Sequence, residues 1–230
     1  MNNGILCIVA TPIGNLKDIT LRALETLKSV DLIAAEDTRH TKILLEHYDI
    51  HVPLTSYFEH NQIKKTEYII EQLKQGKSIA LVSDAGTPGI SDPGFVVINR
   101  AIKEGIKTEA MPGACALITG LVLSGLPADK FIFEGFLSPK TAARQKRLKE
   151  LIGEERTIIL YESPHRALKT IADIAAIMPQ AELVCVREAT KMFEEVTRGK
   201  PEEVLLHFQN HAPKGEFVMV ISQKKPKTKK

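Results

Sequence analysis

The sequence predicts an α/β protein built from two α/β domains. Short apolar segments typical of buried strands alternate with longer amphipathic segments along most of the chain, an order that favours a largely parallel sheet with helices on both faces. A run rich in Gly, Ala and Leu, residues 114–126, interrupts this alternation near the middle of the chain. We therefore expect a first domain at residues 1–113, a smaller second domain at 114–223 and a basic tail of disordered composition at 224–230.

The first domain contains four expected strands separated by helical stripes. The strands are residues 5–10, 31–35, 78–82 and 107–111. Apolar residues at helical spacing predict helices around 19–30, 43–48, 63–73 and 95–102. Gly76 stands where a glycine commonly ends a helix. Asp92-Pro93 has the pattern of an N-cap followed by the first helical residue.

The second domain is expected to contain a mixed sheet. Its strands are residues 131–136, 157–161, 183–186 and 217–221. Ser138-Pro139 and Ser163-Pro164 both have the pattern of an N-cap followed by proline at the first helical position.

Composition places the chain among cytoplasmic proteins without a membrane segment. The longest apolar stretch is too short to cross a bilayer, and no basic region precedes Ile5, so a secretory signal is not expected. Cys7, Cys115 and Cys185 are odd in number and widely separated, which favours reduced thiols over disulfides or a metal site. We expect Cys7 and Cys185 to lie in the core, because both stand inside strand-like runs.

Positive charge is concentrated in two places, although the net charge is only +3. One is the tail 224–230, and the other is a segment with five basic residues: Lys140, Arg144, Lys146, Arg147 and Lys149. Such clusters suit a polyanion such as RNA, and we expect Arg144, Lys146 and Arg147 to contact it. The alternative is a solvated helix face with a tail that aids solubility.

Three loops rich in Gly and Pro follow strands of the first domain, at residues 11–15, 83–94 and 112–116. Ligands bind outside the carboxyl ends of strands in open parallel sheets, so these loops should form one ligand platform. A P-loop would need a Gly-Lys-Ser/Thr ending, and a dinucleotide site would need three glycines after the first strand. The chain has neither pattern, so the sequence gives little support to a P-loop or to a dinucleotide-binding site. Asp84 could instead face a cationic ligand such as a sulfonium. Alternatively, its carboxylate could accept backbone hydrogen bonds in a turn or a helix cap, as expected for Asp92.

Polar motifs follow two strands of the second domain. Residues 161–166 read Tyr-Glu-Ser-Pro-His-Arg, and residues 187–191 read Arg-Glu-Ala-Thr-Lys. Each pairs a carboxylate with a cation near a strand end, either to handle substrate or as a structural ion pair. A third polar motif, residues 36–41, contains His40, which could act in catalysis or simply lie at a helix start.

Taken together, these motifs resemble the ribosomal RNA small subunit methyltransferase I family, which is similar in fold to the tetrapyrrole methylases. The segments that carry the resemblance are residues 9–19, 35–39, 82–94, 111–113, 161–166 and 187–191. The resemblance spans residues 5–221. It differs from the wider tetrapyrrole methylase pattern in the first loop, which reads Thr-Pro-Ile-Gly, and at Gly86-Thr87-Pro88, where Gly-Asp-Pro is usual.

The resemblance implies S-adenosylmethionine as methyl donor, held in a cleft between two α/β domains of a homodimer. It implies 2'-O-methylation of a cytidine, cytidine 1402, in the decoding region of 16S ribosomal RNA in the small ribosomal subunit. The implied donor site comprises Pro12, Ile13, Gly86, Thr87, Pro88, Ile90, Ser91, Gly113, Ala114, Cys115 and Tyr161, with Asp84 as a possible substitute for the missing carboxylate.

The expected chemistry is placement of the ribose hydroxyl in line with an activated methyl group, with water excluded. Glu162 and Glu188 are the candidate bases. The candidate groups that grip phosphates or assist the hydroxyl are Arg166, Arg187 and Lys191. Two alternatives stay open: a methyltransferase of the same fold that acts on a tetrapyrrole, and an RNA-binding module without catalytic activity.

Overall fold

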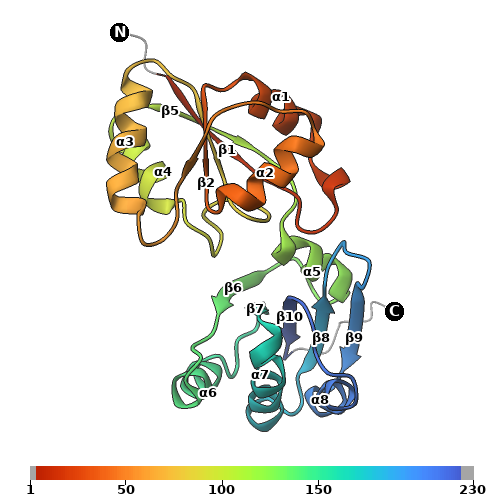
Figure 1. Ribbon diagram of the computed structural model, residues 1–230. Helices are drawn as coiled ribbons and strands as arrows, with labels where there is room; N and C mark the ends of the chain where they lie inside the picture. The colour runs from red at the N-terminus through yellow and green to blue at the C-terminus, as the bar shows by residue number, and fades with distance from the viewer. Residues whose placement is uncertain (1–3, 224–230) are drawn as a thin grey trace. The chain divides into compact units, whose positions relative to one another are not determined.

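The computed structural model describes residues 4–223 and divides the chain into two compact units, Met1–Cys115 and Ala116–Lys230 (Figure 1). Each unit contains its own five-stranded sheet. The expected α/β class and the two-part organisation are thus observed. The expected basic tail, residues 224–230, lies outside the described residues.

Unit 1 has a fully parallel sheet in the order β3-β2-β4-β1-β5. Its strands are β1 (Ile5–Val9), β2 (Leu32–Ala35), β3 (Leu54–Ser56), β4 (Ile79–Val82) and β5 (Lys107–Met111). Its helices are the 3-10 turn η1 (Leu16–Asp18), α1 (Leu21–Ser29), α2 (Thr38–His47), α3 (Gln62–Lys74) and α4 (Phe95–Lys103).

Alternating residues of the unit 1 strands pack against helices on both faces. In β1, Leu6 belongs to the cluster with α3 and α4, whereas Cys7 and Val9 belong to the cluster with α1 and α2. Figure 1 shows these two helix pairs on opposite sides of the sheet. Burial on both faces explains why β1, β2 and β4 are continuously apolar.

Unit 2 has a mixed sheet in the order β6-β7-β10-β8-β9. Its strands are β6 (Phe131–Phe136), β7 (Thr157–Glu162), β8 (Glu182–Arg187), β9 (Glu195–Gly199) and β10 (Phe217–Ser222). Its helices are α5 (Ala116–Ser124), α6 (Thr141–Glu150), α7 (Pro164–Ile177) and α8 (Pro201–Asn210). β6, β7 and β8 run in one direction, because β7 and β8 are both antiparallel to β10 and β6 is parallel to β7.

The two faces of the unit 2 sheet are covered differently. One carries the main core with α7 and α8, and the other is covered by α5 (Figure 1). Gly120 brings α5 close to the sheet, since a Cβ there would stand 2.5 Å from Val218 Cγ1. The Gly/Ala/Leu run is therefore a packed helix of unit 2.

The eight expected strands are confirmed, and β3, β9 and α8 were not predicted. Both missed strands lie at sheet edges, where half-buried polar residues hide the strand pattern. Cys7 and Cys185 lie in the core as expected. No helix among residues 4–223 is long and apolar enough to cross a membrane.

Two expected helix starts were wrong by two residues. α4 begins at Phe95, because Gly94 still packs against the backbone of Gly89 and Asp92 is not the cap. α6 begins at Thr141, and Ser138 Oγ accepts the N–H of Lys140 at 3.3 Å. The Ser163-Pro164 start of α7 is confirmed.

Candidate functional site

The three Gly/Pro-rich loops of unit 1 meet at the carboxyl edge of its sheet. β1 lies between β4 and β5 in the parallel sheet, so the loops after these strands are neighbours. Thr11 N–H donates to Gly86 O at 2.8 Å, and Gly86 N–H donates to Thr11 O at 3.1 Å. Thr87 Oγ1 donates to Ala114 O at 3.3 Å. These bonds join all three loops into one backbone platform.

Glycine is required where the loops approach each other. Gly86 has φ of 81°, and a Cβ on it would stand 3.2 Å from Ile13 Cγ2. A Cβ on Gly113 would stand 2.9 Å from Ala10 Cβ. The structure thus brings together most of the residues predicted for the donor site, namely Pro12, Ile13, Gly86, Thr87, Pro88, Gly113, Ala114 and Cys115.

Ile90 and Ser91 continue the second loop beyond this platform. Ile90 N–H donates to Thr87 O at 3.2 Å, which closes a turn, and Ser91 has φ of 64°. Tyr161, the remaining predicted donor residue, lies in unit 2. Its hydroxyl accepts the N–H of Leu117 at 2.9 Å, and its ring meets Phe133 and Phe136 edge to face.

Asp84 points to the start of α2. Its Oδ1 accepts the N–H of Asp37 at 2.9 Å, and its own N–H donates to Glu36 Oε2 at 3.4 Å. Burial raises the pKa of Glu36, and the neighbouring carboxylates of Asp84 and Asp37 add to this. Asp37 caps α2 by accepting the N–H of Arg39, and its bonds from the Arg39 side chain hold its own pKa well below the usual range.

A cavity of roughly 100 Å³ lies between the β1 loop and α2. It is lined by Thr11, Pro12, Gly14, Leu16, His40, Thr41, Ile43, Leu44, Ser83 and Asp84. Thr41 is 3% exposed, and its hydroxyl has no hydrogen-bond partner in the described part of the chain. Sequence reasoning missed Thr41, although Leu44, Leu45 and Tyr48 place it on the buried stripe of α2.

The two polar motifs of unit 2 leave its sheet at the same edge. Phe217 of β10 pairs with Glu162 at the end of β7 and with Arg187 at the end of β8. The two motifs therefore stand at matching positions on either side of β10.

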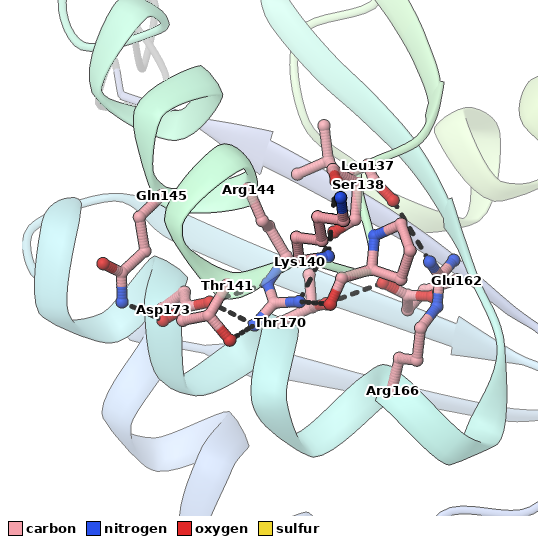
Figure 2. A network of polar contacts seen from close by, with 11 residues as sticks. Leu137, Ser138, Lys140, Thr141, Arg144, Gln145, Glu162, Arg166, Thr170 and Asp173 are labelled. Carbon is pink, nitrogen blue, oxygen red and sulfur yellow. Dashed lines mark hydrogen bonds and ion pairs between the residues drawn. The ribbon is translucent and has the colours of Figure 1, made fainter.

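Glu162 is held in a structural network. It is 2% exposed, and it accepts bonds from Thr170 Oγ1 at 2.6 Å, Ser163 N–H at 2.8 Å and the Arg166 guanidinium at 2.7 Å. Figure 2 shows Glu162 with Thr170 and Arg166. These partners occupy both oxygens of the buried carboxylate, an arrangement that favours positioning of the start of α7, together with Arg166, over the predicted role of Glu162 as a base.

Glu188 lies in a strained loop at the end of β8. Glu188 and Thr190 have φ of 51° and 67°, a region that costs energy for residues other than glycine. Lys191 Nζ contacts Glu188 Oε1 at 2.8 Å and Glu216 Oε2 at 3.0 Å. A Cβ on Gly215 would stand 2.2 Å from the Glu188 carboxylate, so this glycine makes room for it. Gly215 and Glu216 were not predicted, because they are far from this loop in sequence.

Lys191 outweighs burial in setting the charge of Glu188. Burial alone would raise the pKa of Glu188, but the bonds from Lys191 and from the Glu216 backbone lower it overall. Burial would likewise lower the pKa of Lys191, whereas Glu188 and Glu216 raise it. Arg187 is paired with Glu195 at 2.9 Å. The Glu188 carboxylate and the Lys191 ammonium group are therefore both charged at neutral pH.

The predicted RNA contacts on α6 differ in their surroundings. Arg144 is 2% exposed, and both its Nε and Nη2 lie 2.6 Å from Asp173 Oδ2 (Figure 2). A guanidinium buried in this way cannot reach a phosphate, so the expectation for Arg144 was wrong. Arg147 is exposed but paired with Glu134 at 2.8 Å and Glu150 at 2.9 Å. Lys146 is exposed.

Within residues 4–223, no group of three or more His, Cys, Asp or Glu side chains is placed to hold a metal ion.

Comparisons with known proteins identify the family. The family described as Tetrapyrrole (Corrin/Porphyrin) Methylases matches residues 6–205. Among solved structures, diphthine synthase has a TM-score of 0.73 at 19% identity, covering 95% of this chain and 90% of that one. Uroporphyrin III C-methyltransferase from Thermus thermophilus has a TM-score of 0.66 at 16% identity, covering 95% and 97%. At these identities the two structures show the fold alone.

Curated relatives are much more similar in sequence. The protein from Synechocystis sp. is 51% identical over 97% of this chain and 80% of its own length. The protein from Thermotoga maritima is 49% identical over 96% of this chain and 99% of its own length. Both are named Ribosomal RNA small subunit methyltransferase I. The chain therefore belongs to the tetrapyrrole methylase family and, within it, to the ribosomal RNA small subunit methyltransferase I family.

Proposed function

We propose that the protein transfers the methyl group of S-adenosylmethionine to the 2'-hydroxyl of cytidine 1402 in 16S ribosomal RNA. The observation that carries this proposal is the interlocked loop platform at the carboxyl edge of the unit 1 sheet, in a chain about 50% identical to ribosomal RNA methyltransferases. The small ribosomal subunit is the proposed substrate. A homodimer and a cytoplasmic location are proposed with it, from the family resemblance.

The platform suits a donor held mainly by backbone groups. It is small and apolar, and it lacks the Lys that a phosphate loop needs. When bound, S-adenosylmethionine supplies a methyl group already activated on a sulfonium. The residues proposed to hold it are Pro12, Ile13, Gly86, Thr87, Pro88, Ile90, Ser91, Gly113, Ala114 and Cys115 of unit 1 and Tyr161 of unit 2.

Glu188 is the proposed base for the ribose hydroxyl. It is a carboxylate at neutral pH, and Lys191 orients it from 2.8 Å. The strain at Glu188 and Thr190 fits a loop whose shape serves chemistry. Arg187 and Lys191 are proposed to approach the acceptor's phosphates, and Lys146 to add a contact that does not depend on RNA sequence.

An RNA acceptor is favoured over a tetrapyrrole. The relatives near 50% identity are named for ribosomal RNA, whereas two solved structures of uroporphyrin III C-methyltransferase are 16% and 19% identical. Incubating the protein with labelled S-adenosylmethionine and either unmethylated small subunits or a tetrapyrrole mixture distinguishes the two. The expected result is label in one cytidine whose 3'-phosphodiester bond resists alkaline cleavage, because its 2'-hydroxyl is methylated. Label in the tetrapyrrole, or no donor binding at all, would refute the proposal.

Single-turnover kinetics test the base. Glu188→Gln should lower the methylation rate by about 10²-fold or more, because general-base assistance is of that order. Glu162→Gln is the matched control, because it removes a buried structural carboxylate. It should lower the free energy of unfolding, and it should leave the single-turnover rate constant of the folded protein close to that of wild type. Equal rates for Glu188→Gln and wild type would exclude this role.

A further inference from the structure

The cavity beside α2 contains an unsatisfied buried hydroxyl. Thr41 Oγ1 has no hydrogen-bond partner in the described residues, although Thr41 is 3% exposed and lines the cavity. An unpaired buried hydroxyl destabilises the free protein, because it has lost its hydrogen bonds to water. Such a group is explained if a ligand supplies the missing partner.

The position of the cavity indicates which ligand that is. Thr11 and Pro12 form one of its walls, and the same segment carries the bridge to Gly86 in the proposed donor platform. The proposed donor platform and the cavity thus share the segment that contains Thr11 and Pro12. An occupant of the cavity would lie next to the methyl donor.

We propose that this cavity receives the cytosine base of the acceptor nucleotide, an inference that rests on the proposed function. A ribose in the middle of an RNA strand can reach a donor in a protein only if its nucleotide is unstacked, and an unstacked base needs a pocket. The cavity, roughly 100 Å³, has room for a small organic group rather than for a single water.

The lining matches the edge and faces of cytosine. Leu16, Ile43 and Leu44 supply apolar contacts for the ring. Asp84 Oδ1 is occupied by Asp37 N–H, but Oδ2 has no partner within residues 4–223 and can accept from the exocyclic amino group. Carboxylates commonly read this group of cytosine. The Thr41 hydroxyl can donate to O2 or N3.

The charge of the cavity excludes a phosphate. Asp84 lines it, and Glu36 lies directly behind, bonded to the Asp84 N–H. Two carboxylates this close to the cavity make a further anion unfavourable there. A neutral ligand that donates hydrogen bonds fits instead.

Thr41→Val tests the hydroxyl. Val keeps the shape, so the KM for unmethylated small subunits should rise about 2–10-fold, the value of one neutral hydrogen bond. S-adenosylmethionine binding measured by calorimetry should stay unchanged, and the thermal midpoint should stay equal or rise, because no bond is lost in the free protein. The control is Thr66→Val, which removes the bond between Thr66 Oγ1 and Tyr57 Oη at 3.3 Å; it should lower stability and leave KM unchanged.

Asp84→Asn tests base reading. Asn Oδ1 would keep the bond from Asp37 N–H, so its Nδ2 would present a donor to the cavity. That donor repels the cytosine amino group and matches O4 of uracil. The measured quantity is the ratio of kcat/KM for small subunits with uridine at the target position to kcat/KM for those with cytidine. This ratio should be about tenfold or more higher for Asp84→Asn than for wild type.

The outcomes separate this inference from the proposed function. If wild type methylates no ribosomal subunit, the proposed function fails. If wild type is active, but Thr41→Val keeps its KM and Asp84→Asn keeps its base preference, the base pocket alone is refuted. Weaker S-adenosylmethionine binding by Thr41→Val at unchanged subunit KM would assign the cavity to the donor, which also overturns the inference.

Discussion

Two arginines of α6, three residues apart, show how burial decides the role of a charge. Arg144 is 2% exposed and paired with Asp173, whereas Arg147 is 44% exposed and paired with Glu134 and Glu150. Removing one partner of a buried pair leaves an uncompensated charge, while exposed pairs contribute little. Arginine therefore stabilises the fold at position 144, whereas at position 147 it lies at the surface and contributes little to stability.

Arg144→Met should reduce the free energy of unfolding by roughly 3–5 kcal/mol, because among the described residues Asp173 would keep only the hydrogen bond from Gln145, at 2.7 Å. Arg147→Met, the exposed counterpart, should cost less than about 1 kcal/mol. Urea denaturation measures both. Equal losses would show that Asp173 is readily solvated after the change.

Glu188 should make stability depend on acid pH. Its folded-state pKa is below the ordinary value of 4.5, since the bonds from Lys191 and Glu216 outweigh burial. The stabilisation is thus present above pH 4.5 and is lost as pH falls through the folded-state pKa. The stability difference between wild type and Glu188→Gln should shrink as pH is lowered below 4.5, measured by denaturation at several pH values. A difference that stays constant would contradict the ion pair.

At the scale of elements, the loop platform depends on glycine at close approach. Gly86→Ala should weaken S-adenosylmethionine binding, because φ of 81° is unfavourable for alanine and the Cβ would press on Ile13 at 3.2 Å. Gly105→Ala is the matched control: φ is 68°, and no atom lies within 4 Å of the new Cβ. Both should lose on the order of 1–2 kcal/mol of stability. Calorimetry should show weaker donor binding for Gly86→Ala alone, and equal binding by both variants would remove this loop from the donor site.

At the scale of the whole molecule, net charge is a poor guide to RNA contacts. The chain carries +3, but Arg144 and Arg147 of α6 are both neutralised by carboxylates in the structure. Exposed lysines such as Lys146 are better placed for phosphate.

Lys146→Ala should flatten the salt dependence of binding to small ribosomal subunits. One lost phosphate contact reduces the slope of log K against log salt by roughly 0.7–0.9. Arg147→Ala should change the slope less, since its charge is already shared with Glu134 and Glu150. Filter binding over a salt series measures both, and the reverse order would place the RNA on the Arg147 side of α6.

Sequence by itself determined the class of fold and the place of the platform. The period of apolar residues located every strand buried on both faces, and glycines and prolines after β1, β4 and β5 located the loops that meet. These are local signals: side-chain alternation and backbone freedom are written into a few consecutive residues. Edge strands β3 and β9 escaped, because packing on neighbours, not their own pattern, makes them strands.

Tertiary structure alone decided which polar side chains are available. Arg144 and Glu162 stand in charged motifs, but both are hydrogen-bonded to side chains of α7. Arg144 donates to Asp173, and Glu162 accepts from Thr170. The sequence pattern of α2 indicates only that Thr41 is buried, whereas the fold leaves its hydroxyl unpaired in a cavity with Asp84, 43 residues away in the chain. The reason is physical: desolvation and pairing depend on groups brought together by the fold, and these set whether a charge or hydroxyl can act on a ligand.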